Sequence, residues 1–109
     1  MTGAGAYRRD RRRLVEELRA GGIEDLAVLH AFDAVPRHLF VPEAVRHRAY
    51  EDAALPLGHG QTISRPAVHA LHLSLADLEG DERVLEVGTG SGYQTALLAR
   101  LCREVYSVE

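Results

Sequence analysis

The feature that most constrains this chain is the glycine-rich segment Gly88-Thr89-Gly90-Ser91-Gly92. Residues 83–87 before it form a short apolar run that reads as a buried strand, and residues 93–101 after it carry leucines at helical spacing. A second strand is predicted over residues 104–108. A strand, a helix and a strand within about 30 residues form a right-handed parallel crossover unit in nearly all cases. The sequence therefore predicts an α/β fold.

The spacing of these glycines limits the ligand that such a turn could bind. Glycine lets a ligand approach the backbone closely, and the helix start beyond it offers free amide N–H groups. A dinucleotide motif would need glycine where Tyr93 stands, and a phosphate loop would need lysine, which the chain lacks. A nucleophile elbow at Ser91 would need glycine at positions 89 and 93. The remaining match is the acidic-x-G-x-G-x-G motif of class I methyltransferases, which begins at Glu86.

Glu109 supports a nucleoside-containing cofactor. It ends the second predicted strand and follows Gly92 by 17 residues. An acidic side chain at this place can accept hydrogen bonds from ribose hydroxyls. The alternative is a turn that only connects a strand to a helix, with Glu109 in solvent.

Two helices are predicted before residue 35. The first begins in the arginine run of residues 8–13, has an apolar stripe of Leu14, Val15 and Leu18, and ends at Gly21-Gly22. The run is interpreted as a solvated helix start in which Arg12 and Arg13 pair with Glu16 and Glu17; an anionic partner site is the alternative. The second helix runs from Glu24 or Asp25 to Ala34, with Leu26, Val28, Leu29 and Phe32 inward.

A short helical turn is expected around residues 44–47, and the following residues 50–66 show no sustained period. Prolines and glycines there predict an ordered loop with short extended pieces, of a length that is often functional. His59, between two glycines, is read as a turn residue. A third helix should start near Ser64 to Pro66 and end before a turn at residues 79–81. Its predicted buried face consists of Val68, Leu71, Leu75 and Leu78.

Over nearly its whole length the chain resembles the protein-L-isoaspartate O-methyltransferase family. The resemblance is carried by Val35-Pro36-Arg37, Phe40-Val41-Pro42, Ala49-Tyr50-Glu51-Asp52, Leu55-Pro56-Leu57-Gly58, Gly60-Gln61-Thr62-Ile63-Ser64-x-Pro66 and Val84 to Tyr93. The glycine motif is shared by many methyltransferases, whereas the Gln-Thr-Ile-Ser segment at this distance before it is far more specific.

The resemblance implies a Rossmann-like class I methyltransferase fold with S-adenosyl-L-methionine as the methyl donor. The implied substrate is the free carboxylate of an isoaspartyl residue in a damaged protein, so the implied function is protein repair. Ser64 corresponds to the family's active-site serine. The implied cofactor residues are Gln61, Thr62, Ile63, His69, Glu86, Gly88, Thr89, Gly90 and Glu109. No metal is implied.

The chemistry expected of such an enzyme is simple. A substrate carboxylate with a pKa of roughly 3.5–4 is already ionised at pH 7, so no general base is needed. The protein has to align the carboxylate oxygen, the methyl carbon and the sulfur. The lack of an obvious acid–base pair therefore does not argue against an enzyme.

Three features depart from the family pattern. Arg65 and Ala67 replace a commoner small or amide residue and an aromatic residue, which could alter substrate preference. The family also continues through further strands beyond the second. The sequence therefore predicts the N-terminal part of one methyltransferase domain, with a helical region and active-site loop in residues 1–80 and the start of the cofactor sheet in residues 81–109. No measurable methyl transfer is expected of such a piece alone, because its substrate side is missing.

Two alternatives to repair methylation stay open at this level. One is a related O-methyltransferase that modifies aspartates of a peptide natural product. The other is an inactive truncated remnant that acts as a binding module. Without the resemblance, Ser64 could be only the N-cap of the third helix.

Composition and charge limit the partners and the cellular location that the sequence predicts. The net charge of −3 does not suggest a nucleic-acid or membrane partner, and no signal peptide or apolar stretch of about 20 residues is evident. Cys102 is the only cysteine, which excludes an internal disulfide and favours a reducing, cytoplasmic location, with this side chain in or near the core. His69 and His72 have metal-compatible spacing but no third ligand, so no metal site is predicted. The oligomeric state is left open.

Overall fold

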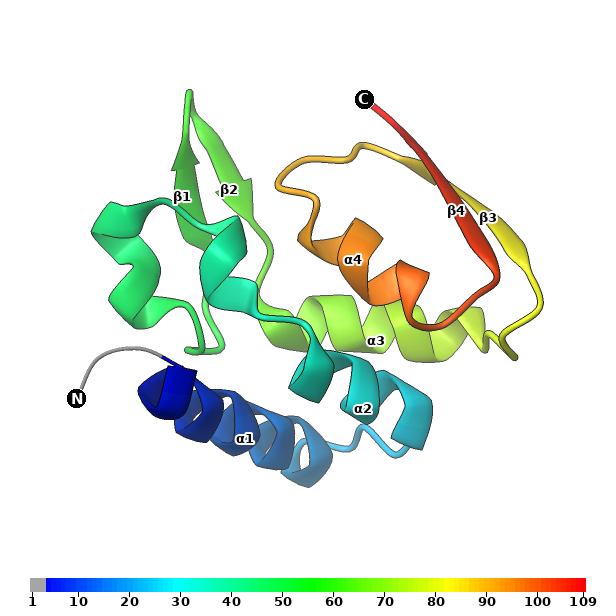
Figure 1. The fold of residues 1–109 in the computed structure, drawn as a ribbon, viewed down its shortest axis with the longest axis horizontal. Helices are drawn as coiled ribbons and strands as arrows, with labels where there is room; N and C mark the ends of the chain where they lie inside the picture. The colour runs from blue at the N-terminus through cyan, green and yellow to red at the C-terminus, as the bar shows by residue number, and fades with distance from the viewer. Residues whose placement is uncertain (1–3) are drawn as a thin grey trace.

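The N-terminal third of the chain folds into two helices that pack on each other. In a computed structural model, which describes residues 4–109, α1 spans Ala4–Ala20 and α2 spans Leu26–Ala34 (Figure 1). The predicted stripe of α1 is buried, and the helix ends at Gly21-Gly22 as predicted. Asp25 caps α2, since its carboxylate accepts hydrogen bonds from the N–H groups of Ala27 and Val28.

Two details of these helices differ from prediction. Leu26 is 62% exposed, because the buried face of α2 is made by Val28, Leu29, Ala31 and Phe32. Arg13 pairs with Glu17 at 3.6 Å, as predicted, and also with Asp10 at 3.2 Å. The structure gives no corresponding ion pair between Arg12 and Glu16.

Short elements fill residues 37–63. Two 3₁₀ helices, η1 at Arg37–Phe40 and η2 at Glu43–Arg48, lead into an antiparallel hairpin of β1 (Leu55–Gly58) and β2 (Gln61–Ile63). Leu55 pairs with Ile63, and both side chains are buried. His59 lies in the turn with a φ of 54°. The predicted extended pieces therefore form a hairpin. The first residue of β1 and the last residue of β2 anchor its open end in the core.

The third helix, α3, spans Pro66–Ala76 and starts where predicted. Its predicted buried face was wrong for Leu71 and Leu75, whereas Val68 and Leu78 are half-buried. Pro66, Ala70 and Leu73 are buried, whereas Leu71 is 51% exposed and Leu75 is 73% exposed. Helix α3 packs on α1 and α2, and its fully buried residues are Ala70 and Leu73, whereas Leu71 lines an open cavity beside Leu14 and Leu18 of α1.

The predicted crossover unit is present at the C-terminal side. Strands β3 (Arg83–Val87) and β4 (Glu104–Val108) pair in parallel, and α4 (Tyr93–Ala99) connects them. The prediction that the first strand is buried was wrong, because α4 covers only one face of this two-stranded sheet. Successive side chains alternate between faces, and Leu85 and Val87 are 65% and 75% exposed.

The core lies between the helices and reaches the start of α4. Tyr93 is fully buried and packs edge-on against Phe32, with ring centroids 6.1 Å apart, and against Phe40 at 5.6 Å. Leu97, Leu98, Leu101 and Cys102 are buried as predicted. Because Tyr93 directly follows Gly92, this packing fixes the end of the glycine-rich segment. Among residues 4–109, no helix is both long and apolar enough to cross a membrane.

Candidate active site

Two loops form the candidate site, and they come from distant parts of the sequence. We call residues 61–65, which are strand β2 and the two residues after it, the serine loop, and residues 88–92 the glycine turn. A cleft of about 240 Å³ lies between them. It is lined by Ser64, Val68, His69, His72, Glu86, Val87, Gly88 and Gln94. The fold thus brings the predicted active-site serine and part of the predicted cofactor residues to one cleft.

The glycine turn leaves its backbone open to a ligand. Gly88 and Gly90 have φ values of 94° and 53°, a region in which L side chains are strained. A Cβ atom added at either residue would meet no protein atom within 4 Å. The space above the turn is therefore free for a ligand to contact the main chain.

Glu86 is held in a network of hydroxyl groups. Its Oε1 accepts hydrogen bonds from Ser107 Oγ at 2.7 Å and from Thr95 Oγ1. Ser107 also shares a 2.5 Å hydrogen bond with Thr89. This network orients Glu86 through one oxygen. Ser107 and Thr95 were not predicted from the sequence, although parallel pairing of the two strands would have placed Ser107 opposite Glu86.

Glu109 lies beside the glycine turn. Its Oε1 accepts a hydrogen bond of 2.9 Å from the N–H of Gly90, and its side chain is otherwise exposed. Glu86 and Glu109 stand at the carboxyl ends of two neighbouring parallel strands, which is where such sheets bind ligands. Because of this hydrogen bond, the alternative in which the Glu109 side chain lies wholly in solvent was wrong.

The ring of His69 lines the cleft and is held by a neighbouring side chain. Its Nδ1 is hydrogen-bonded to Gln94 Oε1, and because an amide oxygen only accepts, Nδ1 is the donor. Nε2 is then an acceptor, and it is buried without a partner among the described residues. Burial lowers the pKa of His69, which favours the neutral ring at pH 7.

The other predicted cofactor residues lie elsewhere. Gln61 and Gly90 line a separate cleft of about 380 Å³ together with Ser91 and residues of η1. Thr62 is exposed on β2. The side chain of Ile63 is only 3% exposed and belongs to the core, because strand alternation places it with Leu55. A ligand at Ile63 would therefore meet its backbone.

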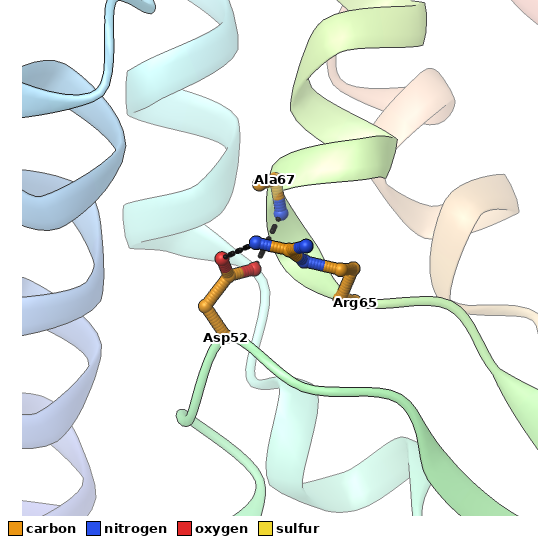
Figure 2. Close-up of polar contacts among 3 residues, drawn as sticks. All are labelled: Asp52, Arg65 and Ala67. Atoms are coloured by element: carbon orange, nitrogen blue, oxygen red, sulfur yellow. Dashed lines mark hydrogen bonds and ion pairs between the residues drawn. The ribbon is translucent and has the colours of Figure 1, made fainter.

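Asp52 fixes the C-terminal end of the serine loop (Figure 2). Its Oδ1 accepts a hydrogen bond of 2.9 Å from the N–H of Ala67, and its Oδ2 pairs with Arg65 Nη2 at 2.6 Å. Arg65, and not Ser64, is the N-cap residue of α3, and its side chain makes no capping bond. The N-cap interpretation of Ser64 was wrong because a distant carboxylate caps this helix. Arg65 faces the Asp52 side and does not line the Ser64 cleft.

The Asp52 contacts make a pH-dependent contribution to stability. The hydrogen bond from Arg65, followed by that from the Ala67 amide, lowers the pKa of Asp52 below its ordinary value. A lowered folded-state pKa stabilises the fold above the unfolded-state pKa of about 4, and the gain is lost as the pH falls through the folded-state value. We expect Asp52→Asn to reduce the free energy of unfolding by about 1 kcal/mol at pH 7.

Urea unfolding at pH 7 and at pH 3 checks this prediction. The difference between the wild-type chain and Asp52→Asn should shrink at pH 3, where the native carboxylate is increasingly protonated. Asp33→Asn is the control, since the Asp33 carboxylate has no partner among the described residues. An equal loss of stability at both pH values would contradict the role of the ionised carboxylate.

No group of three or more His, Cys, Asp or Glu side chains that could hold a metal ion occurs in the part of the chain that the structure describes. His69 and His72 both line the cleft but have no third such partner.

Comparison with known proteins places the chain among methyltransferases. The family model described as protein-L-isoaspartate(D-aspartate) O-methyltransferase matches residues 9–109. A Marinobacter nauticus protein-L-isoaspartate O-methyltransferase is 57% identical over 102 residues, which cover 94% of this chain and 47% of the relative. The Dictyoglomus thermophilum protein of the same name is 52% identical over 103 residues, with coverages of 94% and 47%. The chain thus spans about half the length of the curated relatives it matches.

Two solved structures of similar proteins support the same family assignment. A structure named protein-L-isoaspartate O-methyltransferase superposes with a TM-score of 0.81 at 34% identity, covering 91% of this chain and 33% of the other. A Plasmodium falciparum protein assigned to the same kind of methyltransferase superposes with a TM-score of 0.72 at 31% identity, covering 89% and 46%. The latter was solved in complex with S-adenosyl-L-homocysteine. The α/β fold of the chain is therefore that of part of a Rossmann-like methyltransferase, as predicted.

Proposed function

The chain belongs to the protein-L-isoaspartate(D-aspartate) O-methyltransferase family, and on that premise we propose that it carries the cofactor-binding site and the active-site serine of a carboxyl methyltransferase. The proposed donor is S-adenosyl-L-methionine, and the proposed acceptor is the free carboxylate of an L-isoaspartyl residue in a damaged protein. The observation that supports this most is the single cleft shared by Ser64, Glu86 and Gly88. A cytoplasmic location stays a prediction that rests on the composition.

The groups around the cleft suit this cofactor. S-adenosyl-L-methionine carries an ammonium group and ribose hydroxyls, which are hydrogen-bond donors. The cleft and its rim offer acceptors, namely the carboxylates of Glu86 and Glu109. The open backbone of the glycine turn adds room for close approach. When bound, the cofactor would supply a methyl carbon attached to a positively charged sulfur.

The proposed task of Ser64 is to hold the substrate. Its side chain is exposed at the cleft, where its hydroxyl can donate a hydrogen bond to a carboxylate oxygen. The substrate carboxylate is ionised at pH 7 and needs no base. Positioning of that oxygen in line with the methyl group is then the protein's contribution.

A fusion protein tests the proposed function. Residues 1–109 would be joined to the segment that follows the matched region in the Dictyoglomus thermophilum relative, of which the chain covers 47%. We expect this fusion to transfer a radiolabelled methyl group to an isoaspartyl peptide and not to the matching aspartyl peptide. A folded fusion that binds S-adenosyl-L-homocysteine but methylates neither peptide would contradict the proposal. Preference for the aspartyl peptide would favour the natural-product alternative.

Ser64→Ala in this fusion should lower the rate of methyl transfer by about tenfold, the effect of losing about 1.4 kcal/mol of transition-state stabilisation. The affinity for S-adenosyl-L-homocysteine should change little, because the side chain is assigned to the substrate. His59→Ala, in the hairpin turn, is the control. Unchanged transfer by a folded Ser64→Ala enzyme would remove Ser64 from the mechanism.

A further inference from the structure

Arg37 is a buried charge that the proposed chemistry does not use. Its side chain is 0% exposed, and it forms no ion pair with a carboxylate among the described residues. Burial lowers the pKa of Arg37, but a guanidinium is effectively always protonated in proteins, so the side chain stays charged at pH 7. Burial of an unpaired charge costs several kcal/mol, so contacts of this side chain need a separate explanation.

The guanidinium of Arg37 contacts one residue of the serine loop and the residue that directly follows the glycine turn. Its Nη2 donates a hydrogen bond of 2.8 Å to the backbone carbonyl of Ser64, in the serine loop. Its Cζ lies 4.8 Å from the centroid of the Tyr93 ring, within the range of a cation–π contact. Tyr93 is the first residue of α4 and directly follows the glycine turn. One side chain from η1 therefore joins two loops that are distant in sequence.

The same contacts leave hydrogen-bonding groups unused. Nε and Nη1 of Arg37 and the hydroxyl of Tyr93 are buried without partners among residues 4–109. A buried guanidinium with unpartnered donors is not expected to be kept for stability alone. Replacing a buried ion by a well-packed apolar side chain often leaves the stability of the fold unchanged or raises it. The contact to Ser64 and the contact to Tyr93 are the two that a neutral side chain would lose.

We propose that Arg37 is a positioning residue that sets the distance between the serine loop and the glycine turn. It touches neither substrate nor cofactor and acts through Ser64 and Tyr93. The inference rests on the proposed function, since it assigns a purpose to the cleft between these loops.

The test uses the 109-residue chain and S-adenosyl-L-homocysteine. Arg37→Met keeps an unbranched, flexible side chain but removes the charge and the N–H donors, and Arg37→Lys restores a charge and an ammonium donor group. Arg46→Met is the matched control, because Arg46 also donates to backbone carbonyls, those of His38 and Val41, but lies outside the cleft. Amide NMR shifts of the unliganded chain, the dissociation constant per folded molecule and the thermal midpoint would be measured for each variant.

We expect Arg37→Met to shift the amide signals of both loops and to weaken S-adenosyl-L-homocysteine binding by about tenfold, the loss expected for a charge-assisted hydrogen bond. Arg37→Lys should lie between Arg37→Met and the wild type, and Arg46→Met should leave both loops and the affinity unchanged. Wild-type affinity in Arg37→Met, or shifts confined to the serine loop, would overturn the proposal. If Arg37→Met does not fold, Arg37→Lys decides by the same two readouts. Failure of the wild-type chain to bind the ligand would contradict the proposed function, and the unliganded amide shifts would still test the coupling.

Discussion

Gly90→Val is expected to abolish saturable binding of S-adenosyl-L-homocysteine by the folded chain. Gly90 has a φ of 53°, and a branched side chain in this region is strained by about 1–2 kcal/mol. A new Cβ at Gly90 would meet no protein atom within 4 Å, so the side chain would occupy the space that we assign to the ligand. Both effects act on the same turn, and isothermal titration calorimetry would measure the loss.

Gly80→Val is the matched control for this prediction. Gly80 also has a positive φ, 109°, and an added Cβ there also meets no protein atom within 4 Å. Its position between α3 and β3 lies outside both loops of the cleft. The control should lose some stability and keep its affinity. Circular dichroism must show that both variants are folded. If a folded Gly90→Val variant binds the ligand as tightly as the wild type, the glycine turn only connects β3 to α4 and does not bind the cofactor.

Glu109→Ala is expected to weaken S-adenosyl-L-homocysteine binding by about tenfold to a hundredfold, the range for a lost hydrogen bond to a charged group. One carboxylate oxygen of Glu109 already accepts the N–H of Gly90, so the carboxylate is held next to the glycine turn. In the proposed complex the carboxylate accepts hydrogen bonds from the ribose hydroxyls.

Glu104→Ala at the other end of β4 is the control for Glu109, because among residues 4–109 the polar partners of the Glu104 side chain are Tyr106 and Arg103, both outside the cleft. Calorimetric titration of both variants against the wild type separates a ribose contact from a general loss of negative charge. Equal affinities in all three proteins would show that Glu109 does not contact the ligand.

The sequence predicted the crossover unit well because its signals are local. The glycine turn, the leucines of α4 and the apolar residues of both strands lie within 26 consecutive positions, and the structure has all three elements at nearly the predicted bounds. The end of α1 followed from Gly21-Gly22, the end of α2 from Pro36 and the start of α3 from Pro66 in the same way.

The wrong predictions concern which face of an element is covered. Leucines at helical spacing on α3 show that this face is apolar, but not which neighbour lies against it. The structure packs α3 through Ala70 and Leu73, and Leu75 stays exposed. The apolar residues of β3 were ambiguous in the same way. They show that the strand is apolar, but not that α4 covers one face of the sheet and leaves Leu85 and Val87 exposed.

The hydrogen bonds that support the site could not be predicted from the sequence, for a different reason. The cap of α3 comes from Asp52, the support of Glu86 from Ser107, and the bond to the Ser64 carbonyl from Arg37. Each contact joins residues that are more than ten positions apart, and no local pattern encodes it. The family resemblance marked the segments of Arg37 and Asp52 without giving either residue a role.

The serine loop and the glycine turn are proposed to form one cofactor site, and an NMR titration of the 109-residue chain with S-adenosyl-L-homocysteine tests this most directly. Saturable shifts are expected in the amides of residues 61–65 and 88–92 and of Glu109, with one common dissociation constant. Tyr7 and Arg11, which line a different cleft beside η1, should not shift. An absence of saturable shifts, or shifts that cluster outside the two loops, would contradict the claim.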